Sequence, residues 1–175
     1  MLNKKMEAAL NGQINEELFS SYLYLSMSAH FESLNLRGFA NWMRVQAQEE
    51  LVHAIKIYDY IIAKGGRAAL KTVKGPETEW KSPLAMFQAA LKHEEHITGC
   101  INDLSTLALD LKDHASAIML QWFVTEQVEE EANATEIIQK LKLMQDAPGG
   151  LFLLNNELAQ RVFTMPAGAG PQAGA

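Results

Sequence analysis

Residues 48–54 read QEELVHA and place Glu50 three positions before His53, so that both side chains project from one face of a helix. Glu17 stands 33 residues before Glu50 and 36 residues before His53. The same intervals recur 77 residues later in the chain, at Glu94, Gln127 and Glu130. The two halves of the chain therefore share one geometry of metal-type ligands, which favours a site for two metal ions.

The composition is that of a globular protein of one domain. The 175 residues are 48% hydrophobic and have a net charge of −6, which argues against a general nucleic-acid binder and favours cations as partners. Cys100 is the only cysteine, which excludes a disulfide or a cysteine-based metal site within one chain. Because neither a signal-like N-terminus nor a long uncharged stretch is present, we expect a cytoplasmic protein without a membrane-spanning segment.

Apolar residues recur at helical spacing through most of the chain. Turn and capping signals divide it into four long helices and a short fifth one, over residues 3–33, 39–64, 82–109, 114–145 and 151–163. Residues 166–175 are small and offer nothing to a core, so we expect a flexible tail behind one domain formed by residues 1–165.

The connection between the second and third helices, residues 65–81, is much longer than the other two. Its 17 residues can extend over about 55 Å, whereas a helix of 26 residues is about 40 Å long. The connection can therefore cross the full length of a bundle. We predict an all-α, four-helix bundle in up-down-down-up order, with this long crossover and a short fifth C-terminal helix.

The paired ligand positions fall at one height of this bundle. Two residues of a helical hairpin lie level when the turn is midway between them, and the midpoint of Glu17 and Glu50 falls in the first short turn. The midpoint of Glu94 and Gln127 falls in the second short turn. Buried carboxylates cost several kcal/mol unless they are paired or bind metal. Since Lys and Arg do not occupy matching inward positions, metal binding is the simplest explanation.

The two halves of the predicted site differ. A di-metal site in a bundle core takes Glu-x-x-His from each of two helices, and here Gln127-x-x-Glu130 replaces the second one. We expect one metal ion to bind to Glu17, Glu50 and His53. We expect the other to bind to Glu50, Glu94 and Glu130, with Gln127 able to fix a bound water or dioxygen. Such an all-oxygen site is looser and suits an iron ion that leaves after oxidation.

Six motifs are distinctive as a set, and they are EELF (16–19), YLYL (22–25), GFANWM (38–43), QEELVHA (48–54), QWFV (121–124) and EQVEEE (126–131). Together they resemble the non-haem ferritins of bacteria and archaea, over roughly residues 3–163. The resemblance implies a ferroxidase, in which ferrous iron binds a di-iron centre and is oxidised by dioxygen or hydrogen peroxide. It also implies a hollow shell of 24 identical subunits that stores the ferric product as a mineral.

The resemblance assigns further residues. Tyr24 is expected beside the di-iron centre, where it donates an electron or orients a ligand, although core packing explains it equally well. Trp122 has the same two interpretations. A third iron site is implied at Glu49, Glu126, Glu129 and Glu130. His93 and His96 have no counterpart in the repeat, and we expect both to be exposed to solvent.

Departures from related families narrow the function. Haem-binding bacterioferritins carry a methionine where this chain has Val52, so no haem is expected. We expect two iron ions per subunit with a third site, and the partner that reduces stored iron is left open. Two alternatives remain at this point, a di-iron oxidase or peroxidase that stores no mineral and a non-catalytic helical shell protein.

Overall fold

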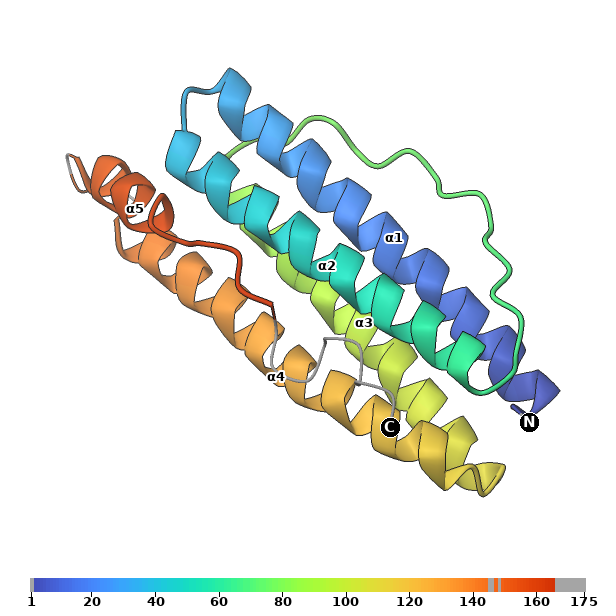
Figure 1. Cartoon of the computed structure of the whole chain (residues 1–175). Helices are drawn as coiled ribbons and strands as arrows, with labels where there is room; N and C mark the ends of the chain where they lie inside the picture. The colour runs from blue at the N-terminus through green and yellow to red at the C-terminus, as the bar shows by residue number, and fades with distance from the viewer. Residues whose placement is uncertain (1, 145–146, 148, 166–175) are drawn as a thin grey trace.

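A computed structural model describes residues 2–144, 147 and 149–165 of the chain (Figure 1). The described residues form five helices and no strand, and these are α1 (Lys4–Ser33), α2 (Arg37–Ala63), α3 (Pro83–Asp110), α4 (His114–Leu143) and α5 (Gly150–Leu158). The first four form a bundle in which α1 pairs with α2, α3 pairs with α4, and α1 packs against α3. The predicted all-α bundle is confirmed.

The helix ends follow local chemistry. The Asn3 side chain accepts a hydrogen bond from the Lys5 N–H at 2.9 Å and begins α1, and Ser82 accepts one from Ala85 at 3.1 Å and begins α3. The short turns after α1 and α3 each contain a residue with a left-handed backbone, Asn35 at φ 59° and Lys112 at φ 54°. These turns reverse the chain within a few residues, so each hairpin is antiparallel.

The crossover, residues 65–81, runs the length of the bundle along the outside of α1 (Figure 1). The Asn11 side chain of α1 holds its first part, donating to the Arg67 carbonyl at 2.9 Å and accepting from the Ala69 N–H at 2.6 Å. Ser26 holds its later part by donating to the Glu77 carbonyl at 2.6 Å. As a result α2 and α3 run in the same direction, in the predicted up-down-down-up order.

The apolar core is divided into two clusters by a polar layer. The cluster near α5 contains Phe31, Phe39 and Phe87, and the cluster at the opposite end contains Ile57 and Leu120, all of them fully buried. The acidic ligand candidates lie between the clusters, near the middle of each of the four helices. The burial on both sides of this layer keeps it away from solvent.

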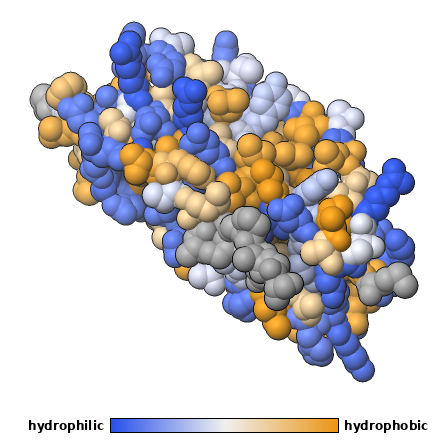
Figure 2. Space-filling view, in the orientation of Figure 1, coloured by the Kyte–Doolittle hydropathy of each residue, from blue (hydrophilic) through white to orange (hydrophobic). Residues whose placement is uncertain are grey.

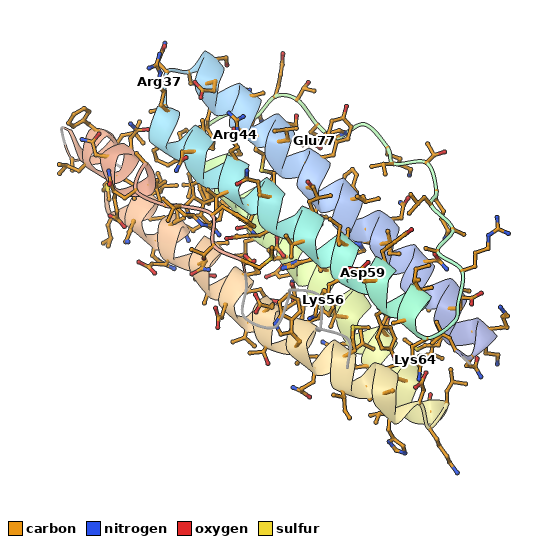
Figure 3. All side chains as sticks on the ribbon, viewed as in Figure 1. Arg37, Arg44, Lys56, Asp59, Lys64 and Glu77 are labelled. Carbon is orange, nitrogen blue, oxygen red and sulfur yellow. The ribbon has the colours of Figure 1, made fainter. Side chains whose placement is uncertain are left out.

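Charged side chains labelled on α2, such as Arg44 and Asp59, project outward from the bundle (Figure 3). None of the helices in the described part of the chain is both long and apolar enough to cross a membrane. On the face shown in Figure 2, hydrophobic side chains gather over α1 and α2. Those that α2 exposes follow one helical stripe, at Leu51, Ile55, Tyr58 and Ile62.

The fifth helix is shorter than predicted. It ends at Leu158 rather than at 163, because the Asn41 side chain of α2 donates to the Leu158 and Arg161 carbonyls at 3.3 and 2.8 Å. These carbonyl groups therefore have a hydrogen-bond donor without a further turn of α5. The predicted end of the fourth helix at 145 and the predicted tail at 166–175 fall outside the described residues.

Gly38 permits the close approach of α5 to the start of α2. A Cβ atom at Gly38 would lie 1.6 Å from the Asn155 carbonyl oxygen, which is far inside van der Waals contact. The Asn155 side chain accepts a hydrogen bond from the Gly38 N–H at 2.8 Å, which satisfies one of the free N–H groups at the start of α2.

We predict that Gly38→Ala destabilises the protein by about 1–3 kcal/mol, because the added methyl group must push α5 away from α2. Gly99→Ala is the matched control, since a Cβ at Gly99 meets no atom within 4 Å and alanine favours helix by about 0.5–1 kcal/mol. Thermal unfolding measures both variants. Equal melting temperatures would contradict the close packing of α5 on α2.

Candidate metal centre

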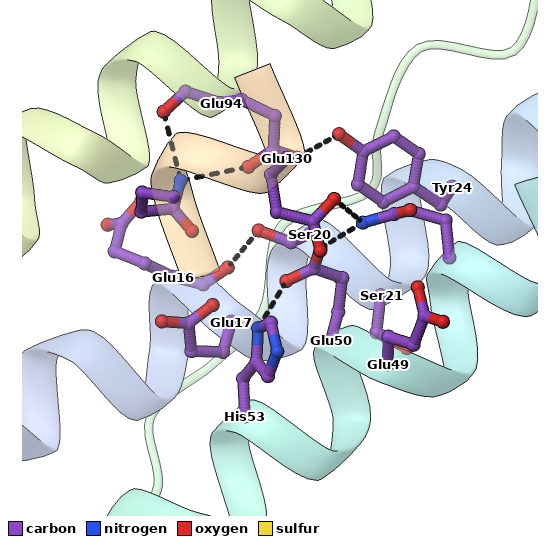
Figure 4. Close-up of polar contacts among 12 residues, drawn as sticks. Glu16, Glu17, Ser20, Ser21, Tyr24, Glu49, Glu50, His53, Glu94 and Glu130 are labelled. Carbon is purple, nitrogen blue, oxygen red and sulfur yellow. Dashed lines mark hydrogen bonds and ion pairs between the residues drawn. The ribbon is translucent and has the colours of Figure 1, made fainter. Parts of the chain in front are cut away.

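The six predicted ligand residues come from all four bundle helices and meet in the polar layer (Figure 4). All are buried, and they are Glu17 from α1, Glu50 and His53 from α2, Glu94 from α3, and Gln127 and Glu130 from α4. The level pairing is as predicted: the Gln127 amide donates to the Glu94 carboxylate at 3.1 Å and to the Glu94 carbonyl at 3.3 Å. Their role as ligands stays a prediction.

One half of the layer is suited to a metal ion. Ligand atoms of Glu17, Glu50 and His53 all lie within 4.8 Å of one another, and no other set of three such side chains in the described residues does so. Glu50 Oε2 lies 3.3 Å from His53 Nδ1. Glu17 Oε2 and His53 Nε2 are buried without a hydrogen-bond partner. Unsatisfied buried polar atoms are rare and costly, so these three residues fit a cation.

The other half is tied together by hydrogen bonds. The Tyr24 hydroxyl, 1% exposed, donates to Glu94 Oε1, so Tyr24 lies beside the centre as predicted (Figure 4). The Gln46 amide donates to Glu130 Oε2 at 2.7 Å and to Glu50 Oε1 at 2.9 Å. Gln46 therefore connects the carboxylates of α2 and α4.

Sequence reasoning missed Gln46, although a signal was present. Gln13 stands four residues before Glu17 and donates to Glu17 Oε1 at 2.9 Å. Gln46 stands four residues before Glu50 and donates to it in the same way. The repeated Gln-x-x-x-Glu spacing places an amide one helical turn from each carboxylate, and it marks both carboxylates as buried and hydrogen-bonded.

Burial sets the protonation of the acidic groups. Burial, together with the nearby charge of Glu50, raises the pKa of Glu17 and the pKa of Glu94 to about 8 each. Burial also raises the pKa of Glu130, assisted by Glu50 and Glu94. Without metal, Glu17 and Glu94 therefore hold protons near neutral pH, and burial shifts Glu130 in the same direction. A bound cation would displace those protons.

Without metal, Glu50 and His53 carry the charges of this layer. Burial disfavours the charged form of His53, but the Glu50 carboxylate outweighs it and raises the pKa of His53 to about 10. Burial likewise disfavours charged Glu50, but the His53 imidazolium and the Gln46 amide lower its pKa below the ordinary value. The layer thus contains one buried ion pair beside the protonated carboxyl groups of Glu17 and Glu94.

Aromatic rings close the layer on the His53 side. The Trp122 ring lies 5.4 Å from the His53 ring in an edge-on arrangement, with Phe123 5.8 Å from the same histidine. The Lys56 ammonium lies 4.5 Å over the Trp122 ring. Trp122 thus contacts a candidate ligand directly, which is compatible with packing and with electron transfer.

The residues predicted for a third iron site are less closely assembled. Glu49 and Glu126 are half-buried and Glu129 is exposed, and they do not join Glu130 in one compact group within the described chain. Glu49 instead forms an ion pair with Arg161, a residue that sequence reasoning did not assign.

The prediction for His93 is wrong. His93 is half-buried, its Nε2 lies 2.7 Å from Ser20 Oγ, and its ring packs against Phe19 and Tyr24. It faces α1 because it follows the buried face of α3 one position before Glu94. His96 is exposed as predicted, with Nε2 3.1 Å from Glu16.

Without metal, the protein should become less stable as the pH rises from about 5 to 8. The unfolded chain releases the protons of Glu17 and Glu94 near 4.5, whereas the folded chain keeps them to about 8, so the free energy of unfolding falls through this range. His53 acts in the same direction, because its stabilising charge is lost as the pH rises from 6.5 to about 10.

Thermal unfolding in the presence of a chelator measures this dependence. Glu17→Gln should flatten it, because glutamine does not titrate, while Glu16→Gln next to it should retain the wild-type slope. Equal slopes in the two variants would contradict the raised pKa of Glu17.

Comparisons with known proteins identify the family of this chain. A ferritin-like domain model matches residues 7–144. The bacterial non-heme ferritin of Bacteroides fragilis strain 638R is 43% identical over 161 residues, covering 92% of this chain and 100% of that protein. A closed form of Archaeoglobus fulgidus ferritin, engineered by site-directed mutagenesis, has a TM-score of 0.92 and 49% identity over 94% of this chain and 100% of that one.

A structure of the open-pore ferritin from the same hyperthermophilic archaeon has a TM-score of 0.91 and 48% identity, over 92% of this chain and 98% of that one. The likeness therefore extends through the sequence, the fold and nearly the whole length of these relatives. The chain belongs to the ferritin family, among the non-haem ferritins of the bacterial and archaeal type.

Proposed function

We propose that this ferritin oxidises Fe(II) at a di-iron centre in each subunit and stores the product as ferric mineral. The observation that carries the proposal is the buried group of Glu17, Glu50 and His53, with two ligand atoms that lack any hydrogen-bond partner. A cation of two positive charges would satisfy both atoms and balance the carboxylates. Iron is the substrate of this centre, so iron ions enter the centre and leave it.

The second ferrous ion is proposed to bind to Glu50, Glu94 and Glu130. Two adjacent Fe(II) ions supply two electrons, which with two protons convert dioxygen to hydrogen peroxide, or hydrogen peroxide to two molecules of water. Glu17 and Glu94 hold protons near neutral pH and release them when the ions bind. All-oxygen ligation is weaker than ligation by imidazole, which favours the departure of the second ion after oxidation.

Storage requires a closed shell, and the exposed stripe on α2 supports self-association. Three residues of this stripe are large, apolar and exposed, at 44% for Leu51, 49% for Ile55 and 41% for Tyr58. Exposed apolar side chains in register commonly mark a subunit interface. Two solved relatives are named as ferritins with a closed form and an open pore. We propose a cage of 24 subunits built from residues 1–165, in the cytoplasm.

The decisive experiment loads the protein with Fe(II) without oxygen, mixes it with aerobic buffer, and records ferric absorbance and particle mass on one sample. Rapid oxidation of two or three ions per chain, in a large shell that then retains many more, is expected. Rapid oxidation by a small oligomer that keeps no iron would instead indicate a di-iron oxidase without storage. An absence of rapid oxidation would leave only a shell protein.

His53→Ala should slow the rapid phase of Fe(II) oxidation by roughly 10- to 100-fold, because it removes the only nitrogen ligand of the proposed centre. His96→Ala is the control, since His96 is exposed and should leave the rate unchanged. Stopped-flow absorbance at fixed iron per chain measures both. A wild-type rate in His53→Ala would refute the proposed centre.

Tyr24→Phe should slow the rapid phase by roughly tenfold with iron binding retained, because the hydrogen bond to Glu94, worth about 1.5 kcal/mol, is lost. Tyr22→Phe is the matched control, because Tyr22 is 49% exposed. Anaerobic titration separates binding from rate. If both variants oxidise iron as fast as the wild type, Tyr24 only packs the core.

A further inference from the structure

Arg161 lies beside the candidate metal centre, although it belongs to the C-terminal segment. The chain after α5 turns back toward the middle of the bundle (Figure 1). Two contacts direct it there: Asn155 of α5 accepts from the Gly38 N–H of α2, and Asn41 donates to the Arg161 carbonyl at 2.8 Å. The backbone of Arg161 is thereby fixed to α2.

The guanidinium group makes four contacts with α2. Nη2 forms an ion pair with the Glu49 carboxylate, Nη1 donates to Gln46 Oε1 at 2.9 Å and to the Trp42 carbonyl at 3.4 Å, and the group lies 4.3 Å over the Trp42 ring. The Arg161 and Glu49 side chains are only 20% and 14% exposed. Such a pair is little weakened by solvent.

Through Gln46, Arg161 is connected to the carboxylates of Glu50 and Glu130. The amide oxygen of Gln46 accepts from Arg161, and the amide nitrogen donates to Glu50 and Glu130. Arg161 therefore determines which way this amide points. The positive charge nearest Glu49 is thus the Arg161 guanidinium, which moves away from Glu49 when the C-terminal segment moves.

We propose that Arg161 is a resident counter-ion of Glu49, which a third divalent cation must displace in order to bind there. The inference rests on the proposed function, because it concerns the third iron site that the resemblance to non-haem ferritins implies next to the di-iron centre. A cation at Glu49 and the Arg161 guanidinium compete for one carboxylate. The ion pair of Arg161 with Glu49 must be broken first, and the other three contacts hold the guanidinium in this position, so together they lower the affinity of this site relative to the two beside it.

Displacement also links the third site to the C-terminal segment. When a cation binds at Glu49, residues 159–165 lose the ion pair that connects Arg161 to α2. They should then exchange their amide hydrogens faster.

The test is an anaerobic calorimetric titration of the assembled protein with Zn²⁺, which does not change its oxidation state. Glu49→Gln identifies the third equivalent as the one that it removes. Arg161→Gln should tighten that third equivalent by about tenfold, or about 1.4 kcal/mol, and should change the first two equivalents less, because it reaches their ligands only through Gln46. Lys140→Gln is the matched control, because Lys140 ties Glu157 of α5 to α4 at 2.6 Å without contacting Glu49.

A second measurement uses the unmodified protein and does not depend on the fold of a variant. Hydrogen exchange of residues 159–165, followed by mass spectrometry, should accelerate when the third Zn²⁺ binds and not when the first two bind.

Three results would overturn the proposal. The first is that every variant binds only two equivalents of Zn²⁺, and the second is that Arg161→Gln binds the third equivalent no more tightly than the wild type. The third is that binding of the third Zn²⁺ does not change the hydrogen exchange of residues 159–165. The failure of the proposed function is distinguishable, because it would appear as first and second equivalents that His53→Ala does not alter.

Discussion

The burial of four carboxyl groups in one layer is the constraint on which the rest of the structure depends. Burying a carboxylate without a partner costs several kcal/mol, and this bundle buries Glu17, Glu50, Glu94 and Glu130 between two apolar clusters. The helices must place these residues at one height, which the two short turns achieve. The amides of Gln13 and Gln46 then satisfy carboxylate oxygens that the apolar clusters cannot.

The layer is asymmetric in its hydrogen bonding as well as in its residues. On the His53 side, Glu17 Oε2 and His53 Nε2 lack partners, whereas the Glu94 side is occupied by the Tyr24 hydroxyl and the Gln127 amide. One half therefore gains more from a cation than the other. This difference agrees with the proposed centre, in which one metal ion is held more firmly than the other.

Charge is balanced from outside the bundle as well as from within. Inside the layer, His53 is the cation that lowers the pKa of Glu50. At its edge, Arg161 pairs with Glu49, and it reaches this place because α5 packs closely on α2 at Gly38. A packing contact between two backbones, more than 100 residues apart in sequence, thus decides the electrostatics beside the centre.

The four long helices, their order and the meeting of the six ligand candidates could all be predicted from the amino-acid sequence. These features follow from helical periodicity, from turn residues and from distances counted along a hairpin, all of which are local or symmetric. The tertiary structure decided the end of α5, the half-burial of His93, the bridging amide of Gln46 and the position of Arg161. Each of these depends on which side chains face one another across helices that pack together, and helical periodicity along one segment does not specify its neighbour.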